Sequence, residues 1–245
     1  MKRWLLGPPV LWLLLFLVLP TAVLASAAFS AEGLATLGKA STWLLLGRSM
    51  GYATLSTLLC LLVSYPAAVF IAGCPTRWKG LLLFLVVLPF WTNLLVRTYA
   101  LMYLLRQLDV LYTTPAVVFG LVQSFVPFMI LPLVTSIEKV PPRLLEAARD
   151  LGATPAAAFR RVTLPLTAPG IAAGCMLVFI PVMGIFALPE FLGGARVSLV
   201  GMQINLLFKQ DSRSAAGSAL TLILMLFTAG LTALYARYKK SEGLA

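Results

Sequence analysis

Six long apolar runs divide the sequence, and they constrain its fold more than any other feature. A helix that crosses a bilayer needs about 20 consecutive, mostly apolar residues. The runs that meet this requirement cover residues 5–28, 50–72, 81–105, 115–137, 166–188 and 217–238. Because the backbone polar groups of a lipid-exposed segment must be satisfied within it, each run is predicted to be a transmembrane helix. The predicted fold is an all-α integral membrane protein with about six spans, which form a single transmembrane domain over residues 1–245.

The charged residues support this prediction and indicate an orientation. Only 11% of the residues are charged, whereas a soluble domain carries about 25%. The net charge of +11 is spread over the segments between apolar runs, so it does not indicate a nucleic-acid partner. With the N-terminus inside, twelve Lys and Arg residues fall in inner segments and six in outer segments, and Arg97 lies within the third run. This bias predicts that both termini are cytoplasmic.

The first apolar run has two interpretations. Its basic start and the Ala25-Ser26-Ala27 sequence resemble a secretory signal peptide with a cleavage site. The apolar stretch is long for a signal peptide, which favours a retained helix. Cleavage would leave the remaining topology unchanged, because the mature chain would still begin outside.

Several chemical functions find no support in the sequence. Histidine is absent, and the three cysteines lie far apart without the spacing of a metal or redox site. No phosphate-binding GxxxxGK[ST] loop is present. We therefore expect neither catalysis nor a cofactor nor a metal in this chain, and a membrane enzyme is the least favoured class. Any use of ATP would require another protein.

The segment after the fourth run carries the densest charge in the chain. It reads EAARDLGATPAAAFRRVTLP over residues 146–165. Two prolines precede it and favour a new helix start, and Gly152 fits the left-handed position just past a helix end. Thr154, followed by proline, is typical of the N-cap of a second helix, which Pro165 is expected to close. The cytoplasmic loop 138–165 is therefore predicted to be a helix–Gly–helix hairpin.

The composition of this hairpin favours contact with another protein. Its alanines at 147, 148, 156, 157 and 158 allow a second surface to approach closely, and its charges of both signs offer recognition. The alternative is an ordinary solvated loop between two spans. That alternative explains the charge, but it explains neither the ordered helix start and stop signals nor the small-residue stripe.

The same segment resembles the EAA motif in permease subunits of bacterial ABC importers. The family pattern is EAA, three residues, Gly, nine residues and Ile-x-Leu-Pro, and the sequence matches it throughout with Val in place of Ile. In that family the segment is a coupling helix seated in a groove of a cytoplasmic ATPase subunit. The resemblance implies a type I ABC importer permease-like fold in the bacterial inner membrane. It assigns ATPase coupling to Glu146, Ala147, Ala148, Asp150, Gly152, Val162, Leu164 and Pro165.

The resemblance also implies partners and a substrate class. The expected partners are two ATP-binding cassette subunits, a second homologous permease, an extracytoplasmic substrate-binding protein and membrane lipid. Further stretches, residues 81–101, 121–140, 144–153 and 165–186, look like permeases of spermidine/putrescine importers. Ala187 and Glu190 depart from that group, which commonly has an aromatic residue and an Asp before the glycine pair. The alternatives are a permease for another solute, such as ferric iron, thiamine or a phosphonate, and a secondary transporter.

Polar and aromatic residues within the apolar runs predict a substrate path. Phe90, Asn93 and Arg97 would share one face of a continuous helix, and polar groups within a bilayer usually face protein or water. Aromatic faces hold ammonium groups by cation–π contact, at about 0.5–2 kcal/mol each, and a carboxylate attracts them. Ordinary helix packing is the alternative for each residue taken alone. The predicted pathway residues are Phe90, Trp91, Asn93, Tyr99, Gln123, Phe186 and Glu190.

Overall fold

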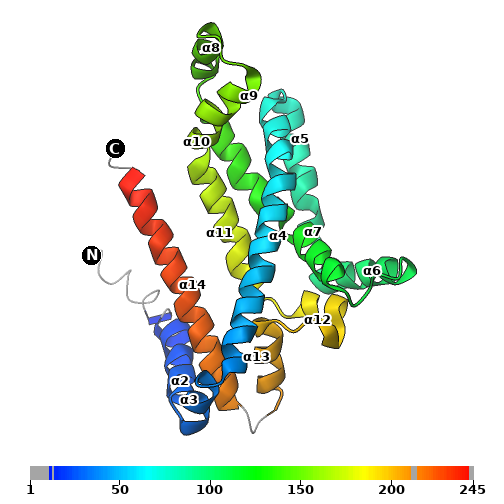
Figure 1. Cartoon of the computed structure of the whole chain (residues 1–245), viewed down its shortest axis with the longest axis vertical. Coiled ribbons are helices and arrows are strands. Elements are labelled where there is room, and N and C mark those ends of the chain that lie inside the picture. The colour runs from blue at the N-terminus through cyan, green and yellow to red at the C-terminus, as the bar shows by residue number, and fades with distance from the viewer. Residues whose placement is uncertain (1–10, 13, 211–213, 243–245) are drawn as a thin grey trace.

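The computed structural model describes residues 11–12, 14–210 and 214–242, and every regular element among them is helical (Figure 1). The prediction of an all-α protein is confirmed. The long helices are α4 (Ala40–Gly73), α7 (Thr114–Ile137), α11 (Ala168–Gly184) and α14 (Ser214–Glu242). The shorter elements are η1 (Leu14–Val18), α2 (Leu19–Ala28), α3 (Ala31–Leu37), α5 (Thr76–Val87), η2 (Leu88–Trp91), α6 (Leu94–Gln107), α8 (Pro142–Asp150), α9 (Pro155–Ala158), η3 (Phe159–Thr163), α10 (Leu164–Leu166), α12 (Ala187–Gly193), η4 (Gly194–Arg196) and α13 (Val200–Phe208).

Among the described residues, three helices are individually long and apolar enough to cross a membrane. They are α4, α7 and α14 up to Arg237. Three pairs of helices reach the same length only if each bent pair is counted as one span, which gives up to six spans. The predicted number of spans is therefore compatible with the structure, but half of the spans are broken rather than straight.

The core is formed by α4, α7 and α11, which pack side by side (Figure 1). The face of α4 in this core carries small side chains, with Ala53, Cys60 and Ala68 fully buried. The Ser64 hydroxyl donates a hydrogen bond to the carbonyl oxygen of Val126 on α7 at 3.4 Å. Small residues let helix backbones approach closely, which is the main source of helix association in a bilayer.

Two glycines of α11 allow equally close packing against α7. A β-carbon at Gly170 would overlap Cβ of Ser136 and lie 3.0 Å from the carbonyl oxygen of Pro132. A β-carbon at Gly174 would lie 2.6 Å from the Met129 sulfur. The GxxxG spacing in the fifth apolar run is therefore used for helix contact.

The third apolar run, predicted as one span over residues 81–105, is broken. The segments Thr76–Trp91 and Leu94–Gln107 meet at an angle of 90°. Pro89 cannot donate the backbone hydrogen bond that continues a helix, and Thr92 has an extended backbone. Asn93 then starts α6, because its side chain accepts a hydrogen bond from the Leu95 amide at 2.8 Å. Hydropathy alone could not detect this break.

Two other predicted boundaries are also corrected. The helix predicted over residues 50–72 begins ten residues earlier, at Ala40, and has 34 residues. At about 1.5 Å per residue it is about 51 Å long, which exceeds the roughly 30 Å hydrocarbon core of a bilayer. The fifth helix ends at Gly184 rather than 188, because Ile185 is extended and the separate helix α12 follows.

The two outermost apolar runs lie together. From the first predicted run, 5–28, the structure describes 11–12 and 14–28, and residues 1–10 and 13 lie outside the described part. Helix α2 packs along α14. Helix α3 makes an angle of 80° with the preceding segment, Leu14–Ala28. The predicted sixth span, 217–238, lies within α14. The choice between a retained helix and a cleaved signal stays a prediction.

The close contact at Gly170 predicts a specific instability. We expect Gly170→Ala to destabilise the protein by about 1–3 kcal/mol, because the added methyl group overpacks the interface between α11 and α7. Gly230→Ala in α14 is the matched control, since a β-carbon there meets nothing within 4 Å. The thermal unfolding midpoint in detergent measures both. An equal midpoint for the two variants would contradict the packing described for α11.

Candidate functional site

The predicted hairpin lies at one end of the molecule, beyond the core helices (Figure 1). Its first helix, α8, begins at Pro142 and ends at Asp150. Gly152 has a φ of +81°, the left-handed conformation that favours glycine. The Gly152 amide donates to the Arg149 carbonyl at 2.8 Å, and the Ala153 amide donates to Ala148 at 2.9 Å. The predicted glycine stop is confirmed.

The second arm of the hairpin begins as predicted but ends later. The Thr154 hydroxyl caps α9 by accepting a hydrogen bond from the Ala157 amide at 3.3 Å. The helix then continues through η3 and α10 past Pro165, which was expected to close it. In η3 the Leu164 amide donates to the Phe159 carbonyl, five residues back, which is a π-helical hydrogen bond. The hydrogen-bond pattern of the helix has therefore already shifted before Pro165. The arm bends by 65° only at Thr167, where α11 starts.

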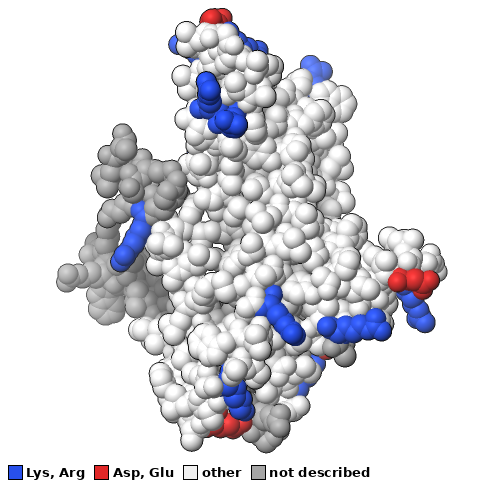
Figure 2. All heavy atoms as spheres, in the orientation of Figure 1, with Lys and Arg blue, Asp and Glu red and all other residues white. Residues whose placement is uncertain are grey.

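The hairpin presents unpaired charge to its surroundings. Figure 2 shows charged side chains gathered at this end of the molecule. Among the described residues, the ion pairs within 4.0 Å are Lys79–Glu138 and Lys209–Glu190, so neither Glu146 nor Asp150 has such a partner. Leu151 beside them is 89% exposed. Of the predicted coupling residues, Ala148 and Val162 are half-buried, and the exposed ones are Glu146, Ala147, Asp150, Gly152, Leu164 and Pro165.

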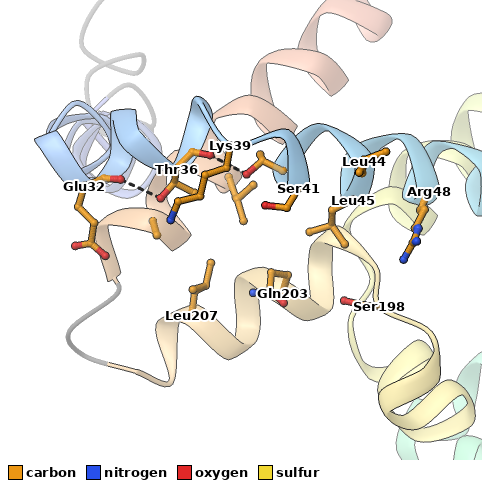
Figure 3. A pocket seen from close by; sticks show the side chains of 13 residues that line it. Glu32, Thr36, Lys39, Ser41, Leu44, Leu45, Arg48, Ser198, Gln203 and Leu207 are labelled. Atoms are coloured by element: carbon orange, nitrogen blue, oxygen red, sulfur yellow. Dashed lines mark hydrogen bonds between the residues drawn. The ribbon is translucent and has the colours of Figure 1, made fainter.

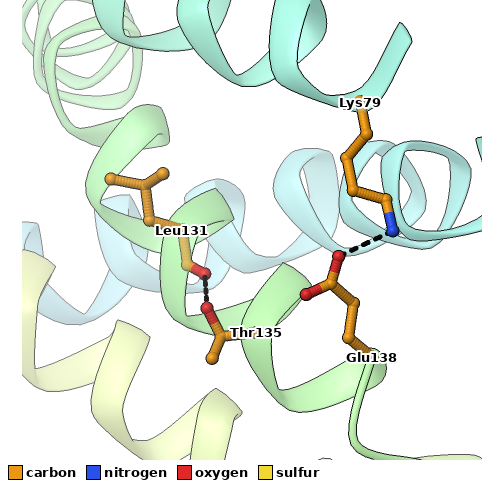
Figure 4. A network of polar contacts seen from close by, with 4 residues as sticks. All are labelled: Lys79, Leu131, Thr135 and Glu138. Atoms are coloured by element: carbon orange, nitrogen blue, oxygen red, sulfur yellow. Dashed lines mark hydrogen bonds and ion pairs between the residues drawn. The ribbon is translucent and has the colours of Figure 1, made fainter. Parts of the chain in front are cut away.

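An ion pair fixes the base of the hairpin to a neighbouring helix. The Lys79 ammonium on α5 lies 2.7 Å from the Glu138 carboxylate, which follows α7 (Figure 4). The turn before α5 and the start of the 138–165 loop are therefore at the same end of the molecule. Both segments are predicted from the sequence to be cytoplasmic, and the ion pair agrees with a common side.

A second candidate site is a cavity of about 540 Å³ near the other end of the core. Tyr99 of α6 and Phe191 of α12 pack with ring centroids 5.0 Å apart. Tyr112 and Glu190 also line this space, and Arg196 adds a positive charge. Two of the predicted pathway residues, Tyr99 and Glu190, therefore meet in one cavity. The sequence analysis did not identify Tyr112 and Phe191.

The turn that brings Tyr112 into this cavity has an unusual backbone. Tyr112 has a φ of +62° and Gly194 a φ of +54°. The Tyr112 amide donates to the Leu192 carbonyl at 2.9 Å, which joins the turn to α12. A β-carbon at position 194 would lie 2.8 Å from the Tyr112 ring. The glycine pair at 193–194 indicates a close approach in the sequence, but the sequence does not indicate that Tyr112 is the residue that approaches it.

The Glu190 carboxylate has only long contacts with its polar and charged neighbours. It accepts a hydrogen bond from the Asn205 side chain at 3.4 Å and lies 3.8 Å from the Lys209 ammonium. About a third of the Glu190 side chain is exposed, whereas Lys209 is 61% exposed. An incoming ammonium group can therefore compete with Lys209 for the carboxylate.

The other predicted pathway residues do not line this cavity. At the break between η2 and α6, the Arg97 guanidinium lies 5.7 Å from the Phe90 ring centroid. Its Nη1 donates to the Pro89 carbonyl at 3.3 Å. Asn93 does not join them as a helix face, because its side chain caps α6. Trp91, Gln123 and Phe186 are exposed and lie outside this cavity.

A larger cavity, of about 740 Å³, lies between the start of α4 and helices α3, α13 and α14. Figure 3 shows Lys39 and Gln203 approaching it from opposite sides. Lys39 and Arg48 outnumber the single acidic residue, Glu32. None of the described residues that line it is aromatic, so this cavity offers no ring faces to ammonium groups.

The sequence matches a family of transport proteins. Residues 63–241 match the family described as "Binding-protein-dependent transport system inner membrane component". The chain is 44% identical over 209 residues to the spermidine/putrescine transport system permease protein PotB of Haemophilus influenzae, covering 78% of this chain and 73% of that protein. It is 37% identical over 247 aligned residues to PotB of Escherichia coli K12, covering 88% and 90%.

Solved structures share the fold at low sequence identity. A bacterial ABC transporter involved in the import of the acidic polysaccharide alginate superposes with a TM-score of 0.72 at 17% identity, covering 96% of both chains. The MetNI methionine ABC transporter superposes with a TM-score of 0.63 at 18% identity, covering 83% of this chain and 98% of that one. At this identity the likeness concerns the fold alone.

Proposed function

Because this chain belongs to the family of inner-membrane components of binding-protein-dependent transport systems, we propose that it forms part of the polyamine path of an ATP-driven importer. The chain is a transmembrane permease subunit resembling the PotB proteins. Its relatives are transport permeases rather than enzymes. The observation that carries the proposal is the exposed, charged hairpin. It lies at the end of the core opposite the cavity lined by Tyr99, Tyr112, Glu190 and Phe191, which we call the aromatic cavity.

The aromatic cavity supports a polyamine as the substrate. Spermidine and putrescine are flexible molecules with several ammonium groups. The rings of Tyr99, Tyr112 and Phe191 provide faces for such groups, and each cation–π contact contributes about 0.5–2 kcal/mol. Glu190 supplies the opposite charge, while Arg196 and Lys209 keep the site from holding a polycation too tightly. Moderate affinity suits a transporter, because a tightly bound substrate would not leave.

The hairpin supports coupling to a separate ATPase. Its residues Glu146 and Asp150 have no ion-pair partner in the described part of this chain, and Leu151 exposes an apolar side chain beside them. Such a surface fits the groove of a partner protein. We assign to this contact the eight coupling residues predicted from the sequence.

The proposed assembly follows from the family. Two ATP-binding cassette subunits bind on the cytoplasmic side, a second homologous permease completes the path, and an extracytoplasmic binding protein delivers the substrate. The excess of Lys and Arg in the inner segments supports a cytoplasmic position for the hairpin and both termini in a bacterial cell. ATP binding then shifts the permease between inward-open and outward-open states by favouring one of them.

The coupling assignment predicts a loss of assembly. Glu146→Lys reverses an exposed charge in the proposed ATPase contact, so co-purification of the ATPase subunit should weaken by about tenfold or more, because like charges brought together at an interface are costly. Glu32→Lys makes the same reversal in α3, far from the hairpin, and should leave co-purification unchanged. Normal assembly and normal uptake with Glu146→Lys would refute the coupling role.

The substrate assignment predicts a change in apparent affinity. Glu190→Gln keeps the shape of the side chain but removes its charge, so the KM for spermidine uptake should rise by about 3- to 10-fold. Glu32→Gln, in the cavity that Lys39 and Arg48 also line, is the control and should not change the KM. Competition by putrescine supports the assignment. Competition by ferric iron, thiamine or a phosphonate, without competition by polyamines, would overturn the substrate and leave the permease function standing.

A further inference from the structure

The second arm of the hairpin is joined to the core by one side chain of α4. The Tyr65 hydroxyl lies 2.9 Å from the Thr167 hydroxyl oxygen. The Tyr65 ring also packs edge-on against the Phe159 ring, with centroids 5.5 Å apart and planes at 86°. A single residue therefore contacts both the π-helical turn of the arm and the point where the arm bends into α11.

The direction of this hydrogen bond follows from the proton count. Thr167 is fully buried, and its hydroxyl donates to the Thr163 carbonyl at 2.9 Å. The Leu164 carbonyl oxygen lies 3.2 Å from the same hydroxyl. A carbonyl oxygen only accepts, and a hydroxyl has one proton to donate, so donation by Thr167 to either carbonyl leaves it to accept the bond from Tyr65. The two bonds form a short chain from α4 through Thr167 to the backbone of the hairpin arm, and linked bonds of this kind polarise and strengthen one another.

Helix α4 continues this connection toward the other end of the molecule. Sixteen residues before Tyr65, about 24 Å along the helix axis, the Ser49 side chain accepts a hydrogen bond from the Val200 amide at 2.8 Å. Val200 begins α13, and Asn205 of the same helix donates to Glu190 in the aromatic cavity. A row of direct contacts therefore runs from the hairpin to the proposed substrate site.

We propose that Tyr65 is a positioning residue that couples movement of the hairpin to α4, and through α4 to the helices around Glu190. This inference rests on the proposed coupling of the hairpin to an ATPase. Without the bond to Thr167, the arm can bend at Thr167 independently of α4, so that ATP hydrolysis moves the hairpin without moving the path. Spatial continuity alone does not establish coupling, and the ratio of transport to hydrolysis provides the required test.

The test compares two tyrosines of α4 that make the same kind of bond. Tyr52 bonds to the Thr114 hydroxyl at 2.9 Å, which matches the Tyr65 bond in chemistry and length. We expect Tyr65→Phe to lower spermidine uptake per ATP hydrolysed by about 3- to 10-fold, the factor that one net hydrogen bond makes in an equilibrium. The ATPase rate should stay close to wild type, and the thermal midpoint should fall by only about 2–4 °C, because one net hydrogen bond is lost. Tyr52→Phe should leave the ratio unchanged. Both variants are measured in the complete reconstituted complex.

Substitutions at Thr167 test whether the bond itself is responsible. Thr167→Val removes the hydroxyl and should reproduce the loss, and combining it with Tyr65→Phe should cause no further loss. Thr167→Ser retains the hydroxyl and should keep the wild-type ratio. A wild-type ratio for Tyr65→Phe, additive losses in the double variant, or a Tyr65→Phe complex that fails to assemble would overturn the positioning role. Wild-type complex without ATP-driven uptake would instead overturn the proposed function.

Discussion

The close packing of α4 against α7 and α11 is the interaction on which the other features depend. Lipid tails are as apolar as the side chains that face them, so the hydrophobic effect does little to bring helices together within a bilayer. Association depends instead on small residues that allow close backbone contact. Gly170 and Gly174 on α11 and the small side chains of α4 provide this contact. The packed core holds the hairpin at one end and the aromatic cavity near the other, about one long helix apart.

This separation explains how a chain with no nucleotide-binding motif takes part in ATP-driven transport. In the proposed coupling, energy enters at the exposed hairpin and reaches the cavity through the core. Helix α4 is long enough to touch both regions, through Tyr65 at one end and Ser49 at the other. The loosely held Glu190 carboxylate lies where a small movement of α13 changes its partners. As the proposed cation site, a weakly held carboxylate of this kind would suit release of substrate after each cycle.

The sequence predicted the parts of the fold that local chemistry determines. Helix α7 lies within one residue of its predicted bounds, because an apolar run with clear helix ends needs no further information. The hairpin followed from proline, glycine and threonine signals. The break at residues 92–93 was missed, because hydropathy counts do not register Asn93 as a helix cap. Tyr112 and Phe191 were missed because their positions depend on left-handed turns and on contacts between distant segments.

In the proposed function, this permease moves polyamines only when a separate ATPase drives it. The most direct measurement is uptake of labelled spermidine into proteoliposomes that contain this chain, its partner permease, the ATPase subunits and the binding protein. We predict uptake with ATP and none with a non-hydrolysable ATP analogue. Uptake that persists without ATP hydrolysis, or without the ATPase subunits, would contradict this account and indicate a secondary transporter.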